Sequence, residues 1–256
     1  MNPIIKLLEK ADRDVVVAQS EYPDGYVGAS HSHQRVQLLH AISGIMQLET
    51  DEGSWIVPPG FALWIPAGVH HLLRTTRVTT RSLYFRSQAL HPAPRACQVI
   101  EVSPLLRQLI DAAAQLPVLY DVRQRDGALM RLLVLEASQA PAVSFHLPMP
   151  RDPALAALCN AFFAAPTQTA TPARWAAALH VSERTFYRRF TAGTGISFIA
   201  WRRQACVFVA ISRLSRGDSV TRIALDMGYE SPSAFSVMFR KATGRAPSAY
   251  VRRVAA

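Results

Sequence analysis

The last third of the chain contains the same residue pattern twice, at a constant spacing of 49 positions. Four residues recur in each copy: Ser182, Phe186, Phe190 and Gly195, then Ser231, Phe235, Phe239 and Gly244. A serine can cap a helix by accepting a hydrogen bond from its first turn, and phenylalanines four positions apart share one helix face. Each copy therefore predicts a short apolar helix, a tight turn and a second helix that begins after the serine. This is the layout of a helix-turn-helix motif, whose second helix lies in the major groove of DNA.

Helix signals also surround the two copies. Asp152-Pro153 and Thr171-Pro172 combine a capping side chain with a proline at the first helical position, where its missing N–H costs nothing. Residues 197–216 predict one long helix between the copies, ended by Gly217. We therefore expect residues 151–256 to form an all-α DNA-binding domain with two helix-turn-helix motifs.

The charge is distributed unevenly along the chain. The sequence has 28 basic and 18 acidic residues, of which 15 and 5 lie after position 150. The net charge is therefore +10 in this region and zero in the first 150 residues. Because phosphates supply most of the non-specific affinity for nucleic acid, this distribution predicts double-stranded DNA as a partner. The alternative is a basic surface that serves only solubility.

Length and composition predict two domains. A chain of 256 residues, half of them hydrophobic, can bury two modest cores. Leu147-Pro148-Met149-Pro150 predicts a stiff connector between them, since prolines favour extended backbone. No apolar run is long enough to span a bilayer, and the first residues lack a secretory pattern, so we expect a cytoplasmic protein with no membrane partner. The cysteines Cys97, Cys159 and Cys206 have no metal-ligand spacing and are expected to be reduced, with redox sensing by Cys97 as an alternative.

The first half of the chain predicts strands. Short β-rich segments separated by turn residues fall at 15–17, 35–41, 45–49, 54–57, 62–65, 70–75 and 81–85. Asp51-Glu52-Gly53 fits a hairpin turn between two of them. Many evenly spaced short strands favour a small antiparallel β-barrel or a jelly roll, which we expect over residues 1–100, and such a barrel can hold one small ligand. The fold class is therefore α+β, in two domains.

Residues 101–150 predict two helices after the barrel. Ser103-Pro104 is a start signal for the first, and the second, at about 122–138, is rich in leucine on more than one face. A helix that apolar must be buried, either on the barrel or against a second copy of the chain. We favour packing on the barrel, with homodimerisation through the same segment.

The strand region resembles the cupin barrel. His31-Ser-His33, with Gln37 and Gly44 beyond, is similar to the first cupin motif, and the segment from Gly60 to His71 is similar to the second. Cupin enzymes bind a divalent metal with two histidines and a glutamate from the first motif and a histidine from the second. The resemblance therefore implies His31, His33 and His71 as metal ligands, but Gln37 stands where the glutamate would be. A neutral amide cannot offset the charge of a metal, so we expect no cofactor and keep a divalent metal as the alternative.

We expect these residues to form a pocket for an organic effector instead. The expected lining residues are His31, His33, Gln37, Trp64 and His71. His70 and His71 are adjacent on a predicted strand, so only one of the two can face inward. The alternative is that the histidines only satisfy backbone groups at the rim of the barrel.

The C-terminal hundred residues resemble the AraC/XylS family of transcription regulators. The motifs that carry the resemblance are Ser182-x-Arg184-Thr185-x-x-Arg188-x-Phe190, Gly195-x-Ser197-Phe198-x-x-Trp201-Arg202 and Gly228-Tyr229-Glu230-Ser231-Pro-Ser-Ala-Phe235. Cys206-Val207 departs from the family, which usually has Arg-Leu at this place. Many members carry a cupin-like domain that binds an effector and dimerises. The resemblance implies a non-enzymatic activator or repressor that responds to a small molecule, acts as a homodimer and can contact RNA polymerase.

Matching positions to the family's motifs also implies the DNA contacts. The base-facing candidates are Arg184, Tyr187 and Arg188 in the first recognition helix, and Ser233, Ala234 and Val237 in the second. An arginine that bonds guanine at two atoms contributes about 1–3 kcal/mol of discrimination, whereas the second set is small and poor in donors. We therefore expect the first helix to carry most of the sequence selectivity. The candidates for phosphate contacts are Ser182, Thr185, Arg189, Arg222, Ser231, Arg240 and Lys241. Each arginine has the alternative role of a solvated surface charge.

Two other functions are compatible with the sequence. One is an effector-independent regulator whose barrel only dimerises, and the other is a cupin metalloenzyme with a DNA-binding tail. Metal analysis of the purified protein separates the enzyme from the regulator. The effector, the target genes and the direction of regulation are not encoded in any motif.

Overall fold

The structure is a computed structural model that describes residues 8–23, 25–50, 53–143 and 147–250, without the side chains of Thr76, Arg77 and Ser215. The chain forms two compact units, Met1–Phe145 and His146–Ala256. The division lies a few residues before the expected connector at 147–150.

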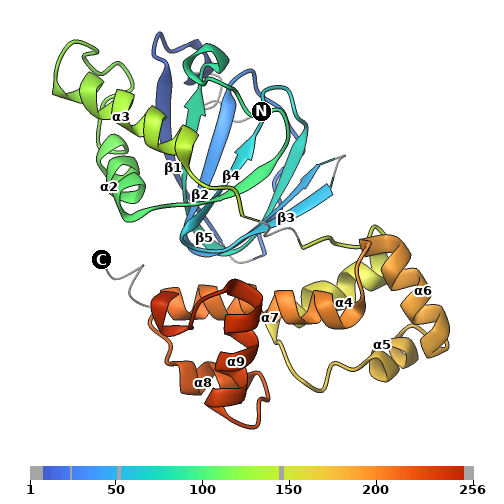
Figure 1. Cartoon of the computed structure of the whole chain (residues 1–256). Coiled ribbons are helices and arrows are strands. Elements are labelled where there is room, and N and C mark those ends of the chain that lie inside the picture. Colours follow the sequence, from blue (N-terminus) through green and yellow to red (C-terminus); the bar gives the residue numbers. More distant parts are fainter. Residues whose placement is uncertain (1–7, 24, 51–52, 144–146, 251–256) are drawn as a thin grey trace. The chain divides into compact units, whose positions relative to one another are not determined.

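The strands of the first unit form one antiparallel sheet. They are β1 (Val15–Tyr22), β2 (Val36–Thr50), β3 (Gly53–Val57), β4 (Phe61–Ile65), β5 (His71–Phe85) and β6 (Gln98–Glu101). The hydrogen-bonded order is β1-β5-β2-β4-β6, with β3 paired to β2 (Figure 1). The expected antiparallel β-fold is confirmed, but among the described strands the path has two ends, at β1 and β6. The sheet is therefore open, and the expectation of a closed barrel is corrected.

Strand lengths differ from the sequence-based expectation. The segments expected at 35–41 and 45–49 are one strand, β2, whose register against β5 shifts between Ala41 and Ile45. Such irregularities bend a strand without ending it, which is why the pairing continues on both sides. The segments at 70–75 and 81–85 are likewise one strand, β5. Residues Asp51 and Glu52 of the expected hairpin turn lie outside the described residues, but Thr50 and Gly53 on either side of them are paired.

Strand β6 was not expected. It is only four residues long and pairs with β4, so the sheet continues to residue 101, past the expected limit of the barrel. A segment this short shows too little alternation to be recognised in a sequence.

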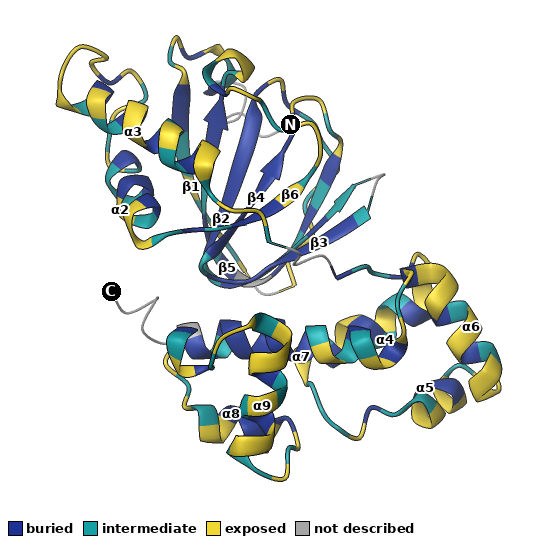
Figure 2. Ribbon diagram, viewed as in Figure 1, coloured by how far each residue is buried: buried dark blue, intermediate teal, exposed yellow. Residues whose placement is uncertain are grey.

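Two helices complete the first unit, α2 (Pro104–Ala113) and α3 (Arg125–Gln139), together with the short helix η1 (Ser87–Ala89). The hydroxyl oxygen of Ser103 accepts a hydrogen bond from the N–H of Leu106, as its capping role requires. Leu106, Ile110 and Leu133 are buried in one hydrophobic cluster with residues of the sheet. Leu132 and Leu135, on another face of α3, are exposed, so only part of this leucine-rich helix is buried on the sheet (Figure 2).

Strand register assigns each residue of the sheet to one of two faces. Leu38 lies opposite both Trp64 and Leu83, and all three belong to the cluster that also contains α2 and α3. Because successive side chains of a strand point to opposite faces, Gln37 and its partner Tyr84 face away from these helices.

The second unit is helical. Its helices are α4 (Pro153–Ala164), α5 (Pro172–Ala178), α6 (Glu183–Thr194), α7 (Phe198–Ser215), α8 (Val220–Asp226) and α9 (Pro232–Thr243). Ser182 caps α6 and Ser231 caps α9, each by accepting a hydrogen bond from a backbone N–H of the first turn. Both helices end at a glycine in the left-handed conformation, with φ of 74° at Gly195 and 75° at Gly244, which favours glycine. The 49-residue repeat therefore recurs as structure.

Long helix α7 connects the two repeated helix pairs, with α5 and α6 toward one end and α8 and α9 toward the other (Figure 1). The core of the first pair is aromatic: Trp175 contacts Phe198 at 4.8 Å between ring centroids, and Phe190 contacts Trp201 at 5.8 Å. Trp201 donates a hydrogen bond from Nε1 to the carbonyl of Pro148 at 3.0 Å, so this part of the expected connector is attached to the helical unit. None of the helices in the described ranges is long and apolar enough to cross a membrane.

Candidate DNA-binding surface and effector site

Helix α6 presents opposite faces to the core and to solvent. Phe186 and Phe190 are fully buried, whereas Arg184, Tyr187 and Arg188 are exposed. The exposed residues have the spacing i, i+3, i+4 and therefore share one helix face. The structure thus brings the three base-facing candidates of the first recognition helix together on an accessible surface.

Helix α9 has the same division with different chemistry. Phe235 and Phe239 are buried, and Ser233, Ala234 and Val237 are exposed, Val237 by 69 %. One hydroxyl is the only polar side-chain group among these three exposed residues. Such a face can contact the methyl groups of thymine but cannot form the bidentate hydrogen bonds that distinguish guanine.

The two capping serines and Thr185 lie at helix N-termini, where backbone N–H groups favour anions. Ser182 accepts a hydrogen bond from the N–H of Thr185 at 3.2 Å and donates one to its hydroxyl oxygen at 3.0 Å. Ser231 accepts one from the N–H of Ala234 at 3.1 Å. Arg240 and Lys241 are exposed in the last turn of α9.

Arg189 has a partner inside the protein. Its guanidinium forms an ion pair with the carboxylate of Asp152, which also caps α4 by accepting hydrogen bonds from the N–H groups of Ala154 and Leu155. These hydrogen bonds and the neighbouring Arg189 hold the pKa of Asp152 below its usual value. The structure therefore places Arg189 in a contact between α6 and α4 and leaves it a poor candidate for a phosphate contact. Arg222 is different, because its Nε is 3.9 Å from the carboxylate of Asp226 and its side chain is 73 % exposed.

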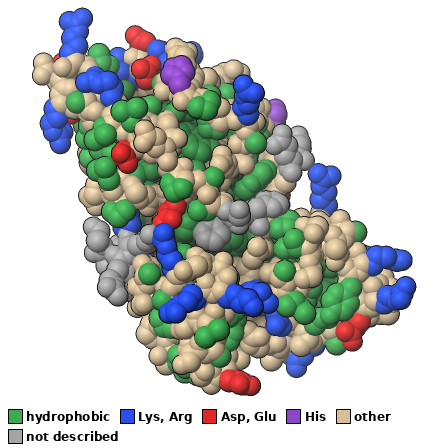
Figure 3. All heavy atoms as spheres, viewed as in Figure 1, with side chains coloured by type: hydrophobic (Ala, Val, Ile, Leu, Met, Phe, Trp, Pro, Cys, Tyr) green, Lys and Arg blue, Asp and Glu red, His purple; other side chains and the backbone are tan. Residues whose placement is uncertain are grey.

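The visible face of the helical unit carries several Lys and Arg side chains and few acidic ones (Figure 3). Nearby pairs neutralise some of this charge, since Arg213 binds both Asp218 and Asp226. The arginines of the exposed face of α6 keep their charge, which makes that face electropositive.

The first unit brings four of the five expected pocket residues together. The ring centroids of His31 and His71 are 4.5 Å apart, and those of His33 and His71 are 5.1 Å apart. Gln37 Oε1 is 2.9 Å from Nε2 of His33. His71, the first residue of β5, is buried, and His70, just before the strand, is exposed, so only one of the two faces inward. We call the group of His31, His33, Gln37 and His71 the histidine cluster.

Trp64 does not belong to the histidine cluster. Its register partner Leu38 neighbours Gln37 in the chain, so Trp64 and Gln37 lie on opposite faces of the sheet. Trp64 is 4 % exposed and contacts Phe85 at 5.2 Å between ring centroids, in the core under α2 and α3. Its expected role in the same pocket is therefore corrected to a core position.

Burial favours the neutral form of the buried rings of the histidine cluster, and their hydrogen bonds indicate which nitrogen carries the proton. Nδ1 of His33 is 2.6 Å from the carbonyl oxygen of Arg35, and burial lowers the pKa of this ring. A neutral ring donates from only one nitrogen, so Nε2 of His33 needs a donor. The amide of Gln37 supplies it when its NH₂ group faces His33 and its oxygen faces the hydroxyls of Ser82 and Tyr84, which lie 3.0 and 3.4 Å from the other amide position.

Among the described residues, Nε2 of His31 and Nε2 of His71 have no hydrogen-bond partner. Their Nδ1 atoms lie 3.0 Å from the carbonyl oxygens of Ala29 and Val69, respectively. Burial lowers the pKa of His71 to about 4, so this ring is neutral, donates from Nδ1 and has a free lone pair on Nε2. The cluster can therefore accept hydrogen bonds from a bound molecule.

The residues do not fit the metal site that the cupin resemblance implies. No group of three His, Cys, Asp or Glu residues in the described part of the chain is arranged to hold a metal ion. Nε2 of His33 is engaged with Gln37, which supplies an amide where a charged carboxylate is needed. We therefore derive no chemistry that depends on a metal.

Comparison with known proteins agrees with this architecture. Residues 14–187 match the model of the AraC-like ligand binding domain, and residues 175–253 match that of a helix-turn-helix domain. The HTH-type transcriptional regulator NimR of Escherichia coli is 31% identical over 224 residues, which cover 88% of this chain and 82% of NimR. The regulator RipA of Corynebacterium glutamicum is 31% identical over 103 residues, 40% of this chain and 31% of RipA. The crystal structure of ToxT from Vibrio cholerae is 11% identical with a TM-score of 0.41, over 94% of this chain and 98% of ToxT, a similarity too low to support further conclusions.

A ligand-binding sheet domain followed by a basic helical domain defines a class of protein, the DNA-binding transcription regulators with a sensory domain. Within this class, the chain belongs to the AraC family.

Proposed function

We propose that this regulator recognises its operator in a sequence-specific manner through α6, with α5–α6 and α8–α9 each acting as a helix-turn-helix motif. The supporting observation is the exposed face of α6, on which Arg184, Tyr187 and Arg188 lie opposite the buried phenylalanines. In contrast to Arg189, neither Arg184 nor Arg188 forms an ion pair with another described residue. Their guanidinium groups are therefore available to bond guanine in the major groove.

Helix α9 has a different role in this proposal. Its exposed face lacks charged groups at the base-facing positions, whereas Arg240 and Lys241 follow in its last turn. We infer that α9 orients the protein by phosphate contacts and adds little base selectivity. Two such helices then occupy successive major grooves, roughly 34 Å apart along the duplex.

We also propose that the first unit binds a small organic effector at the histidine cluster. The free Nε2 lone pair of the buried ring of His71 favours a ligand with hydrogen-bond donors. His31, which is only partly buried, gives such a ligand access from the surface.

The proposal also includes the oligomeric state, the cellular compartment and a further partner. Leu132 and Leu135 form an exposed apolar face on α3, which we propose as the homodimer contact. The protein then acts without catalysis, in the cytoplasm where its DNA target lies, with RNA polymerase as a further partner.

Selection of binding sites from a randomised duplex pool tests sequence-specific recognition. The full-length protein is expected to enrich a motif of two half-sites spaced by one helical turn, with guanine in the half-site read by α6. Arg174, an exposed arginine on α5 outside the proposed contacts, provides the matched control variant Arg174→Ala. Failure of the wild-type protein to enrich any motif would contradict the proposal.

A further inference from the structure

The first unit contains a cavity of about 340 Å³ that is separate from the histidine cluster. It lies where the start of β1 and η1 face α3, and its apolar wall includes Val15, Met130 and Val134. Volumes of about 300–1,000 Å³ are typical of small-molecule sites, which combine apolar walls with a few polar groups.

The two charged side chains that line this cavity, Arg131 and Asp14, differ in their contacts. Arg131 donates a hydrogen bond from Nη1 to the carbonyl of Val122 at 3.0 Å, so its guanidinium is attached to the loop before α3. The carboxylate of Asp14, which is exposed, forms no ion pair with any residue in the described ranges. Asp14 therefore offers acceptor oxygens and a negative charge to a bound molecule.

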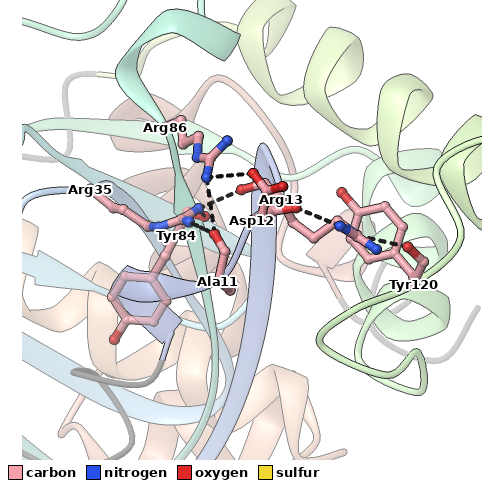
Figure 4. A network of polar contacts seen from close by, with 7 residues as sticks. All are labelled: Ala11, Asp12, Arg13, Arg35, Tyr84, Arg86 and Tyr120. Carbon is pink, nitrogen blue, oxygen red and sulfur yellow. Dashed lines mark hydrogen bonds and ion pairs between the residues drawn. The ribbon is translucent and has the colours of Figure 1, made fainter.

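A network of polar contacts supports the wall beside Asp14 (Figure 4). Tyr120 is 4 % exposed, and its carbonyl oxygen accepts a hydrogen bond from Nε of Arg13 at 2.7 Å. The buried Arg35 in turn donates to the carbonyls of Arg13 at 2.8 Å and Ala11 at 2.6 Å. The residues that lead into β1 are thus attached both to the strand that begins after Arg35 and to the loop between α2 and α3.

This network gives the cavity preformed walls. Tyr120 and Asp14 both line the cavity. Arg13 links them, because it precedes Asp14 in the chain and donates a hydrogen bond to the carbonyl of Tyr120. Its guanidinium also lies over the ring of Tyr120, at 5.3 Å from the ring centroid. The wall at Tyr120 is therefore held by contacts within the protein before a ligand binds, which reduces the entropic cost of binding.

We propose that this cavity binds a small molecule with an apolar body and one basic nitrogen. The apolar body lies against Val15, Met130 and Val134, and the protonated nitrogen pairs with the carboxylate of Asp14. This site depends on neither the histidine cluster nor the DNA-binding surface, but its lining shares Leu135 with the proposed homodimer contact. Its occupant would make the protein a sensor of amphiphilic amines, in addition to or in place of a ligand at the histidine cluster.

Three probes that share one phenyl ring test the assignment on the full-length protein. They are phenethylamine, which is positively charged at neutral pH, the uncharged phenylethanol and the negatively charged phenylpropionate. Calorimetric titration is expected to give phenethylamine an affinity about tenfold higher than that of phenylethanol, with phenylpropionate weakest. Asp14→Asn, which keeps the size of the side chain, is expected to remove this tenfold preference. A preference for phenylpropionate, or equal binding of all three probes, would overturn the assigned chemistry.

Filling the cavity tests its location. Val134→Trp is expected to abolish phenethylamine binding, while Ala128→Trp, at an exposed position of the same helix outside the cavity, leaves it unchanged. Ala89→Leu fills the space from η1 and serves as the second variant should Val134→Trp unfold. Binding that survives in a folded filled variant would contradict the proposal. A filled variant that no longer dimerises in sedimentation experiments, but binds phenethylamine with unchanged affinity, would instead assign the cavity to the contact between two copies of the chain. DNA binding without ligand is measured in parallel, so that failure of the amine site and failure of operator recognition are distinguished.

Discussion

Arg189 of α6 is ion-paired with Asp152, the residue that caps α4. This contact holds α6 against α4, the first helix of its unit. Arg188, its neighbour in sequence, is exposed and lies about 100° further around the helix axis. Adjacent arginines on one helix therefore have different roles, one in positioning the helix and one on the proposed DNA surface.

Replacing these two arginines separates the roles. Arg189→Ala is expected to lower the midpoint of thermal unfolding of the helical unit, because it leaves the carboxylate of Asp152 without its cation. Arg188→Ala is expected to change the free energy of unfolding by no more than about 0.5 kcal/mol, as is usual for exposed positions. Thermal denaturation of both variants followed by circular dichroism checks this. An equal loss of stability in the two variants would show that the ion pair contributes nothing.

Arg188→Ala should act on DNA recognition instead. We expect it to remove about 1–3 kcal/mol of discrimination at one or two base pairs, because a bidentate contact to guanine is lost. Lys241→Ala should weaken binding to all sequences alike and reduce the salt slope by about 1, as a phosphate contact does. Fluorescence anisotropy titrations on matched and mismatched duplexes at several salt concentrations measure both effects. Unchanged base preferences in the Arg188 variant would exclude it from base readout.

The stability of the first unit should depend on pH through His40. This side chain is 2 % exposed, its Nδ1 lies 3.0 Å from the carbonyl oxygen of Phe61, and burial lowers its pKa from 6.5 to about 4. Above pH 6.5 the ring is neutral in both the folded and the unfolded state. As pH falls from 6.5 towards 4, the unfolded state binds the proton first, so stability is lost across this window. One pKa unit corresponds to about 1.4 kcal/mol, so the full loss is about 3 kcal/mol.

Urea unfolding measured between about pH 7 and pH 5 tests this prediction. His40→Gln should reduce, by about the contribution of one buried histidine, the dependence of unfolding free energy on pH in this window. The remaining dependence comes from His71 and His33, whose pKa values burial also lowers. His70→Gln, at an exposed position just before β5, is the control and should leave the dependence unchanged. A wild-type protein equally stable at both ends of the window would contradict the assignment of a neutral buried His40.

Gly127 should tolerate no side chain. A Cβ at this position would lie 2.1 Å from the carbonyl oxygen of Val122, which is backbone and cannot rotate away. Gly127→Ala is therefore expected to destabilise the first unit by about 1–3 kcal/mol, as overpacking does. At Gly28 the nearest atoms would lie 3.4 Å or more away, so Gly28→Ala is the matched control. Chemical denaturation measures the free energy of unfolding of the two variants. Equal values for Gly127→Ala and Gly28→Ala would show that the loop before α3 moves freely.

Much of the helical unit could be predicted because its signals are local. The capping roles of Ser182 and Ser231, like that of Ser103 in the first unit, depend only on the residues of the following turn, and all three are confirmed. The burial of Phe186 and Phe190 follows from helical periodicity in the same way. Once these two phenylalanines are assigned to the core, the opposite face of α6 is expected to be exposed.

The sheet was harder to predict because its signals are not local. Segments 35–41 and 45–49 read as two strands, since the irregularity at Ser43 and Gly44 interrupts the alternation, although pairing with β5 continues across it. The cavity beside Asp14 combines β1, η1 and α3, which lie far apart in sequence. No pattern within any one of these segments indicates it.

The sequence by itself determined the repeated helix pairs, their caps and the concentration of positive charge in the second unit, because helix signals and charge are properties of neighbouring residues. The tertiary structure alone decided which side chains share a site. Trp64 lies away from the histidines because its register with Leu38 places it under the helices, and Arg189 is left out of the proposed DNA contacts because folding brings Asp152 beside it. Strand register and ion pairing join residues that are distant in the chain, so they exist only once the chain has folded.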